Sequence, residues 1–210
     1  MGSSASRATK AAPPAAAAST SISSKVALGA GCYWGTEKYV VKDFQKRFPG
    51  SIKKASVGFM SPHENPPIAN PTYKQVCSGQ STHVEVLYVE LNDPAKHFEE
   101  LIRFFFQFHD PTTPNRQGND AGSQYASWIF CGDDEQAKIA EKVRAELQTL
   151  ITAKGVTCFL KSKVSTKITP MREFTKAEEE HQQYLAKHPN GYCNHRIRFK
   201  EWPMLKKEDV

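Results

Sequence analysis

The sequence predicts an α+β fold, a two-layer sandwich in which helices pack against a mixed β-sheet. Short apolar runs that suit buried strands are interspersed with longer stretches whose apolar residues recur at helical spacing. The resulting order is β, α, β, β, α, β, α, β, α, without the strict alternation typical of a parallel α/β sheet. From Asn190 onwards no periodic pattern continues, so we expect an irregular C-terminal tail.

The first expected elements are a strand, a helix and a second strand. The apolar run 26–29 predicts the first strand, and residues 36–44 carry apolar side chains near helical spacing. The helix should end at Phe48-Pro49-Gly50, which is a strong breaker. Residues 51–59 then predict the second strand.

The middle of the chain predicts a short helix, a central strand and a long helix. Residues 71–77 read as a short helix opened by its proline. The strand over 83–91 is apolar on both faces and should therefore be covered on both sides. Asp93-Pro94 supplies an N-cap and a first-turn proline for a helix with an apolar face. That face, read as core packing, contains Phe98, Leu101, Ile102, Phe105 and Phe108.

The second half begins with a polar loop over 109–123, long enough to suggest a functional role. A strand over 125–131 and an amphipathic helix over 133–154, ended by Gly155, follow it. Residues 156–168 predict one or two strands, and Thr175-Lys176-Ala177-Glu178 is a capping box that should open a last helix.

The composition is that of a soluble globular domain, with 39% hydrophobic and 24% charged residues and no apolar run as long as a membrane span. The net charge of +6 is spread among acidic residues, which favours a solvated surface over nucleic-acid binding. The cysteines are an odd number without a C-x-x-C pair, which argues against a disulfide framework or a zinc ribbon. They are Cys32, Cys77, Cys131, Cys158 and Cys193. We expect a reducing compartment, the cytoplasm.

Residues 1–24 are rich in alanine and serine and contain no acidic residue, so we expect a disordered tail before a domain over 25–210. A plain tail is one interpretation. A short organellar transit segment is the alternative for localisation. Met1-Gly2 followed by Ser6 also matches the myristoylation pattern.

The stretch Gly31-Cys32-Tyr33-Trp34-Gly35 lies where the first strand should turn into the first helix. Free amide groups and the positive end of the helix dipole at such a turn favour a nucleophilic thiolate. The two glycines allow a tight turn and close approach of a ligand. The alternative is that Cys32 is simply a small buried hydrophobic residue.

Glu85 lies inside the apolar pattern of the central strand, where an acid is costly unless it is exposed, paired or neutral. Desolvation there would raise its pKa, so that it could donate a proton. Tyr73 and Tyr125 would add uncharged donors. Taken singly, these could be an exposed acid and ordinary half-buried tyrosines, and Asp120 could simply cap its loop.

Together with these residues, several motifs in a fixed order resemble the peptide methionine-S-sulfoxide reductases of the A class, from about Lys25 to Cys193. The motifs are Gly31–Gly35, Asn70–Tyr73 with Val76-Cys77, His83–Glu85, His109–Thr112 with Asn115–Asp120 and Gln124-Tyr125, and Ala177-Glu178 with His181–Tyr184. The resemblance implies an α+β sandwich, for which we expect a ferredoxin-like core.

The resemblance also implies a role for each matching residue. Cys32 would be the nucleophile and Glu85 the acid, and Cys193 would be the resolving thiol of the C-terminal tail. Tyr33 and Trp34 would wall a pocket for the substrate methyl group. The residues implied to hold the sulfoxide oxygen and a water molecule are Tyr73, Tyr125 and Asp120.

The implied activity is reduction of the S epimer of methionine sulfoxide, free or in proteins, through a sulfenic acid and an intramolecular disulfide. Thioredoxin would recycle the disulfide, and the role would be protein repair under oxidative stress. The resemblance implies no cofactor and no metal, and we expect a monomer with no nucleic-acid partner and no membrane span.

Three departures from the family pattern concern the site. Tyr33 stands where phenylalanine is usual, the interval from Cys32 to Tyr73 is long, and no cysteine follows Cys193. A metal site is a weaker interpretation, because the C-terminal histidines and Cys193 fit no usual ligand spacing. Cys77, Cys131 and Cys158 should pack in or near the core. The rival functions are a nucleic-acid binder and another thiol enzyme, such as a peroxidase.

Overall fold

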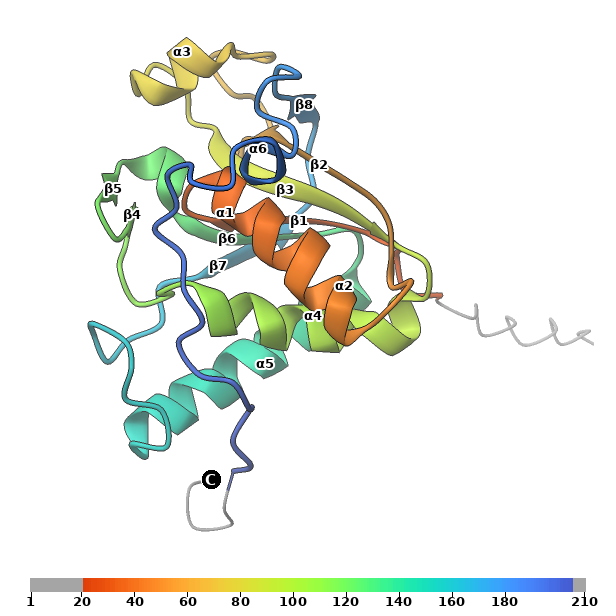
Figure 1. Cartoon of the computed structure of the whole chain (residues 1–210), viewed down its shortest axis with the longest axis vertical. Coiled ribbons are helices and arrows are strands. Elements are labelled where there is room, and N and C mark those ends of the chain that lie inside the picture. Colours follow the sequence, from red (N-terminus) through yellow and green to blue (C-terminus); the bar gives the residue numbers. More distant parts are fainter. Residues whose placement is uncertain (1–20, 206–210) are drawn as a thin grey trace, which may run out of the picture.

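A six-stranded β-sheet forms the centre of the computed structural model, which describes residues 21–205 (Figure 1). Its strands lie in the order β7-β6-β1-β3-β2-β8, and all neighbours are antiparallel except β6 and β7. The bounds are β1 Lys25–Ala30, β2 Ile52–Met60, β3 Val84–Leu91, β6 Ser127–Cys131, β7 Lys167–Pro170 and β8 Phe174–Lys176. The predicted mixed sheet is confirmed.

The segment after β1 is helical from Tyr33 to Arg47 in three successive forms. α1 (Tyr33–Glu37) continues into a π-helical stretch, η1 (Lys38–Phe44), and then into α2 (Gln45–Arg47). The helix therefore ends just before Phe48, as predicted, and begins earlier than residue 36. π-helical turns occur often at functional sites.

Two long helices complete the helical layer. α4 (Pro94–Phe108) is capped by Asp93, which accepts a hydrogen bond from the Lys96 amide at 3.1 Å. α5 (Asp134–Thr152) is capped in the same way by Asp133, as expected from the sequence. Buried side chains of α1, η1, α4 and α5 share one cluster with alternate residues of the strands, so these helices cover the same face of the sheet.

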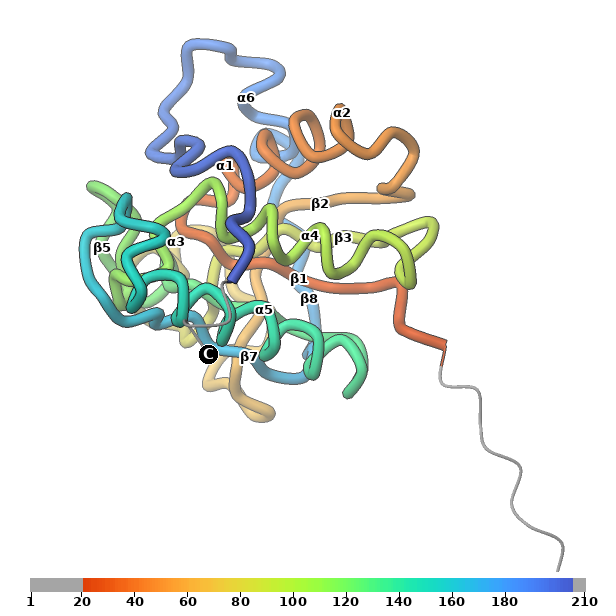
Figure 2. The backbone as a smooth tube through the Cα atoms, turned by 90° about the horizontal axis from the view of Figure 1, so that it is seen from below, coloured from red at the N-terminus to blue at the C-terminus, as the bar shows by residue number. Residues whose placement is uncertain are grey.

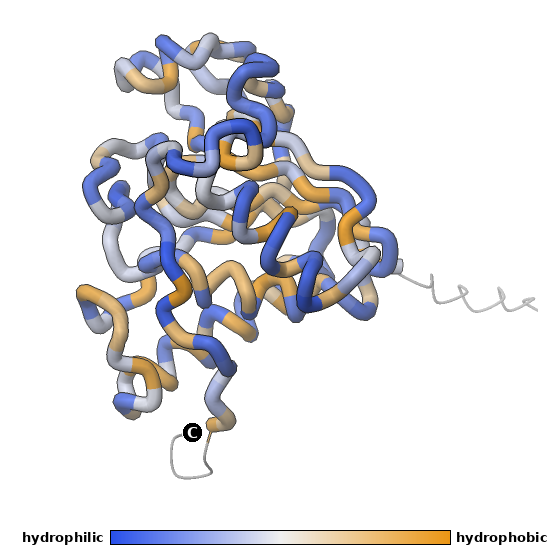
Figure 3. Tube along the Cα trace, in the orientation of Figure 1, coloured by the Kyte–Doolittle hydropathy of each residue, from blue (hydrophilic) through white to orange (hydrophobic). Residues whose placement is uncertain are grey.

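The opposite face of the sheet carries a smaller apolar cluster, formed by Ala27, Met60, Val84, Val86 and Phe130. Met171 and Phe174 pack against it. β3 lies between β1 and β2 and contributes buried residues to both clusters, which confirms that it is central and covered on both sides. In Figure 3 hydrophobic residues are frequent along the central strands and hydrophilic ones in many of the outer loops.

Several local predictions are wrong because longer-range contacts decide the backbone. The capping box over residues 175–178 does not open a helix, since Phe174–Lys176 pairs with the end of β2 as strand β8. The last helix is instead the four-residue α6 (Tyr184–Lys187). In the stretch 156–168, the only strand is the start of β7 at Lys167.

The smaller elements also differ in detail. In α3 (Tyr73–Cys77) the N-cap is Thr72, which forms a capping box with Gln75, so the helix begins two residues after Pro71. The long polar loop contains a hairpin of β4 (Arg116–Gln117) and β5 (Asp120–Ala121). The short 3-10 helix η2 (Ser123–Tyr125) follows, so Tyr125 precedes strand β6. α5 ends at Thr152, and it is Lys154, not Gly155, that has a left-handed backbone conformation after it.

The C-terminal segment beyond α6 is irregular, as predicted, and in both views passes beside α1 (Figures 1 and 2). At the other end, the amide of Leu91 donates to the carbonyl of Ser24 at 2.8 Å. Most of the predicted disordered tail, residues 1–20, lies outside the described residues. Within residues 21–205, no helix combines the length and apolarity needed to cross a membrane.

Candidate active site

Cys32 occupies the turn between β1 and α1, at the N-cap of the helix, and is 7% exposed. The turn depends on Gly31, which has φ +94°. A Cβ atom at Gly31 would also lie 2.6 Å from Cγ of Gln117, so the loop after α4 leaves room only for glycine. The structure thus places the Cys32 thiol at the strand-to-helix turn that the sequence predicts.

The ionisation of Cys32 differs from the expectation for a helix end. Burial raises the pKa of the Cys32 thiol, and the nearby Glu85 carboxylate raises it further. Hydrogen bonds from the Trp34 and Gly35 amides oppose this effect but are smaller. Cys32 is therefore a thiol in the free protein, and the helix end alone does not make it a thiolate.

Glu85 lies on the face of β3 that points toward the helices and is 1% exposed, which excludes an exposed strand-end acid. Its Oε2 accepts a hydrogen bond from the Tyr33 amide at 3.0 Å. Burial raises the pKa of Glu85 to about 8, against the effect of that amide, and Asp120 raises it further. Glu85 is thus mostly protonated at neutral pH, and it is hydrogen-bonded to the amide of the residue that follows Cys32.

The hydroxyl groups of Tyr73 and Tyr125 belong to the same environment. Burial raises the pKa of both tyrosines, and the Glu85 carboxylate adds to each shift. The Tyr73 hydroxyl also lies close enough to the thiol of Cys77 to raise its own pKa further. Both hydroxyls remain protonated donors near Glu85, and Cys77 lies beside the site, whereas Cys131 is in the core as predicted.

Asp120 binds the C-terminal segment on both sides of Cys193. Its Oδ1 accepts from the Tyr192 hydroxyl at 2.8 Å, and its Oδ2 accepts from the Asn194 side-chain amide at 3.0 Å. Asn194 also donates to the Tyr192 hydroxyl. Both carboxylate oxygens that were expected to face substrate and water are therefore used to hold the segment that carries Cys193.

The two aromatic residues after Cys32 pack against His181, which lies between β8 and α6, and Trp34 also packs against Tyr184, the first residue of α6. Trp34 stacks on Tyr184 with ring centroids 3.8 Å apart, and His181 lies 5.8 Å from Trp34 and 4.5 Å from Tyr73. Tyr33 is buried, and its hydroxyl has no hydrogen-bond partner among residues 21–205. His181 and Tyr184 are thus part of the site, although the sequence analysis named them only within a motif and weighed His181 as a metal ligand.

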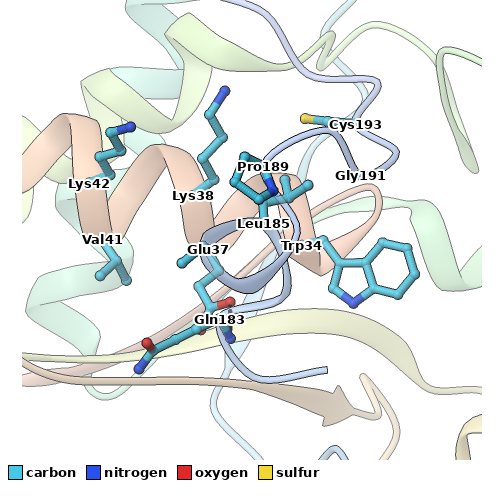
Figure 4. Close-up of a pocket in the computed structure, with 11 residues that line it drawn as sticks. Trp34, Glu37, Lys38, Val41, Lys42, Gln183, Leu185, Pro189, Gly191 and Cys193 are labelled. Carbon is cyan, nitrogen blue, oxygen red and sulfur yellow. Dashed lines mark hydrogen bonds between the residues drawn. The ribbon is translucent and has the colours of Figure 1, made fainter. Parts of the chain in front are cut away.

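A cavity of about 510 Å³ opens beside Trp34 (Figure 4). Trp34 and Cys193 lie at one end of it and Val41 and Lys42 at the other. Beneath it, Glu37 accepts a hydrogen bond from the Gln183 amide at 2.7 Å, and burial raises the pKa of Glu37 to about 7. Cys32 is not among its lining residues, so the cavity borders Cys193 and not the nucleophile.

The C-terminal histidines do not come together. His181 packs among the aromatic residues, while the His195 ring contacts the carbonyl of Ala30. Among residues 21–205, no group of three or more histidine, cysteine or acidic side chains could hold a metal ion. The side chains gathered around Cys32 are a protonated acid and two phenol groups, a set that suits a thiol-dependent enzyme.

Comparison with known proteins identifies the kind of enzyme. The family model described as peptide methionine sulfoxide reductase matches residues 24–209. A probable peptide methionine sulfoxide reductase of Schizosaccharomyces pombe is 40% identical over 165 residues, covering 79% of this chain and 89% of the relative. The chain belongs to the peptide methionine sulfoxide reductase family and has that family's reductase activity.

Solved structures agree with this assignment. The reduced form of Mxr1 from Saccharomyces cerevisiae superimposes with a TM-score of 0.70 at 34% identity, covering 86% of this chain and 94% of Mxr1. Methionine sulfoxide reductase A of Corynebacterium diphtheriae superimposes with a TM-score of 0.66 at 33% identity. The match covers 84% of this chain and 79% of the reductase from Corynebacterium diphtheriae. Mxr1 has also been solved in complex with Trx2, where the TM-score is 0.50 at 24% identity over 89% and 97% of the two chains.

Proposed function

We propose that this protein reduces the S epimer of methionine sulfoxide, free or in proteins, with Cys32 as nucleophile and Glu85 as proton donor. The observation that carries the proposal is the hydrogen bond from the Tyr33 amide to Glu85, which ties a buried acid to the turn bearing the thiol. A raised pKa keeps that acid protonated at neutral pH. Such an acid can deliver a proton to the sulfoxide oxygen as the sulfur of Cys32 attacks.

The products of this first half-reaction are methionine and a sulfenic acid on Cys32, and the proton that the Cys32 thiol loses restores the carboxyl group of Glu85. The Tyr73 and Tyr125 hydroxyls stabilise charge on the oxygen without adding net charge of their own. Tyr33 and Trp34 receive the substrate methyl group. Because Tyr184 stacks on Trp34 in the free protein, this ring moves aside when the substrate binds.

Cys193 completes the cycle by forming a disulfide with Cys32, and thioredoxin reduces it. The complex of the related Mxr1 with Trx2 supports this partner. Asp120 holds both neighbours of Cys193 and keeps its segment close to the site until the sulfenic acid forms. The cavity beside Cys193 leaves this thiol accessible from outside.

The remaining parts of the proposal concern context. Repair of oxidised proteins under oxidative stress is the role, and the odd number of cysteines supports a reducing compartment, the cytoplasm. A ferredoxin-like core is supported by the βαββαβ order of β1, α1, β2, β3, α4 and β6, and by their strand order β6-β1-β3-β2.

The selectivity for one epimer tests the proposed function directly. Fixed positions for the methyl group and for the oxygen donors accommodate only one configuration at sulfur, so we expect turnover of the S epimer alone. Each purified epimer is incubated with enzyme and dithiothreitol, and methionine is quantified. Similar rates for both epimers would contradict the proposal, and faster turnover of hydrogen peroxide than of either would favour a peroxidase.

Replacing Cys193 by serine should separate the two half-reactions. Cys193→Ser is expected to release about one methionine per enzyme and then stall with thioredoxin as reductant, because the sulfenic acid finds no second thiol. Peptide mapping of the oxidised wild-type enzyme should find a Cys32–Cys193 disulfide. A bridge from Cys32 to Cys77, which lies beside Tyr73, would assign the resolving role to the other thiol.

A further inference from the structure

The imidazole of His195 is held in one tautomer. The side chain is 7% exposed, and its Nε2 lies 2.6 Å from the backbone carbonyl oxygen of Ala30. A carbonyl oxygen only accepts hydrogen bonds, so Nε2 must carry the proton. In a neutral ring the other nitrogen, Nδ1, then has a free lone pair.

That lone pair faces the thiol of Cys193. Sγ of Cys193 lies 4.0 Å from Nδ1 of His195 and also 4.0 Å from the His195 carbonyl oxygen. The ring packs directly on α1, since a Cβ atom at Gly35 would lie only 2.7 Å from Cε1 of His195 and closer still to Nδ1. Gly35 is therefore required for the histidine to sit between the turn of Cys32 and the thiol of Cys193.

The groups around His195 keep it neutral. Burial lowers its pKa to about 4, against the effect of the Ala30 carbonyl, and the cations of Arg198 and Lys38 lower it further. The Tyr39 hydroxyl donates to the backbone oxygen of His195 and not to its ring. His109, whose own pKa is lowered by burial, also lies close enough to His195 to interact with it. An unprotonated base thus faces Cys193 throughout the neutral range.

We propose that His195 is the general base of the resolving step, which takes the proton from Cys193 as this thiol attacks the sulfenic acid on Cys32. This inference rests on the proposed role of Cys193. The sulfur–sulfur bond forms as the sulfur–oxygen bond of the sulfenic acid breaks. The departing hydroxide receives the proton that His195 had taken and leaves as water, so the imidazole returns to its neutral form. The sulfur of Cys193 is oxidised and that of Cys32 is reduced.

The anchoring of the base explains why it acts on this step alone. Ala30, Gly31 and Gly35, which surround the ring, belong to the strand and turn that carry Cys32. The histidine therefore stays in place relative to Cys32, and its contact with Cys193 draws that thiol toward the same turn. Glu85, Tyr73 and Tyr125 serve the first half-reaction, and none of them hydrogen-bonds with His195 in the part of the chain that the structure describes.

The experiment measures both half-reactions in His195→Gln after mixing with one equivalent of methionine sulfoxide. Glutamine retains an N–H that can bind the Ala30 carbonyl but is not a base. Release of the first methionine should match the wild type. Disulfide formation is measured as the loss of free thiols in samples quenched with an alkylating reagent. Its rate should fall roughly 10- to 100-fold at pH 7, because an ordinary thiol is ionised only to a few per cent there.

The pH profile distinguishes a base from a merely structural residue. In His195→Gln, disulfide formation should accelerate with rising pH, because hydroxide replaces the missing base, and approach the wild-type rate in alkaline solution. The wild-type rate should depend much less on pH. A variant that is equally slow at every pH, or as fast as the wild type at pH 7, would overturn the proposal. His63→Gln, in the exposed loop after β2, is the matched control and should behave as the wild type.

Two further measurements keep the outcomes separate. If Cys193→Ser still forms a disulfide, the proposed resolving role of Cys193 fails; if it does not, and His195→Gln is unimpaired, only the role of His195 fails. Nitrogen-15 spectra of the wild-type imidazoles test the base without any variant. We expect His195 as the Nε2–H tautomer, unprotonated down to about pH 4, and a titration near pH 6.5 or the opposite tautomer would contradict the assignment.

Discussion

Replacing Cys32 by serine is expected to abolish release of methionine from methionine sulfoxide while leaving the fold intact. The first half-reaction transfers the sulfoxide oxygen to the attacking atom, and a sulfur can accept it as a sulfenic acid. A hydroxyl oxygen would have to form a peroxide bond instead. The serine would also lack an activating base, because Glu85 is protonated at neutral pH and donates rather than accepts.

The measurement is methionine per enzyme in a single turnover, with the circular dichroism spectrum as evidence that the variant is folded. Cys158→Ser is the matched control, since this half-buried thiol lies outside the cluster formed by Cys32, Glu85 and the tyrosines. The control should release methionine normally. Methionine release by Cys32→Ser would transfer the nucleophilic role to another thiol, and Cys77 would be the first to test.

The parts of the site that the sequence predicts well are those set by local chemistry. A cysteine between two glycines at a strand-to-helix boundary places the nucleophile, because the turn has few alternatives. An acid within an apolar strand is costly unless it is exposed, paired or neutral, and Glu85 is buried and neutral. The same logic correctly places β3 at the centre of the sheet and the caps Asp93 and Asp133 at the starts of the long helices.

The parts that the sequence does not predict depend on contacts between distant segments. Asp120 binds Asn194, 74 residues away, and His195 binds Ala30 across 165 residues. No local pattern signals either contact. For the same reason the capping box at Thr175 is misread, since pairing with β2 favours a strand over the helix that the local residues would allow. The net ionisation of Cys32 depends likewise on burial, which the helix end does not reveal.

Glu85→Gln is expected to slow the first half-reaction by roughly 10²- to 10⁴-fold, the range typical for loss of a general acid. Glutamine keeps the shape of the side chain and can still accept the Tyr33 amide through its carbonyl oxygen, so the turn at Cys32 should persist. It cannot donate a carboxylic proton to the sulfoxide oxygen. Substrate affinity should change much less, since the lost interaction develops only as the sulfur–oxygen bond is attacked.

The dependence on pH gives the prediction a second, independent readout. Burial raises the folded-state pKa of Glu85 from 4.5 to about 8, so the proton-donating form is lost as the pH rises through about 8. The wild-type rate should therefore fall as the pH rises through about 8, which gives the pH profile an alkaline limb. The rate of Glu85→Gln should show no such fall. Since the folded state binds this proton more tightly than the unfolded state, wild-type stability should also decline relative to the variant between about pH 4.5 and 8.

Glu90→Gln is the matched control, because Glu90 lies on the same strand but pairs with Lys53 at the surface, with Oε1 and Nζ 2.8 Å apart. It should keep the wild-type rate and the alkaline limb. Single-turnover methionine release from pH 5 to pH 10 compares the three proteins. If Glu85→Gln retains the wild-type rate or the same limb, the proton comes from Tyr73 or Tyr125, whose hydroxyls stay protonated because burial raises the pKa of each.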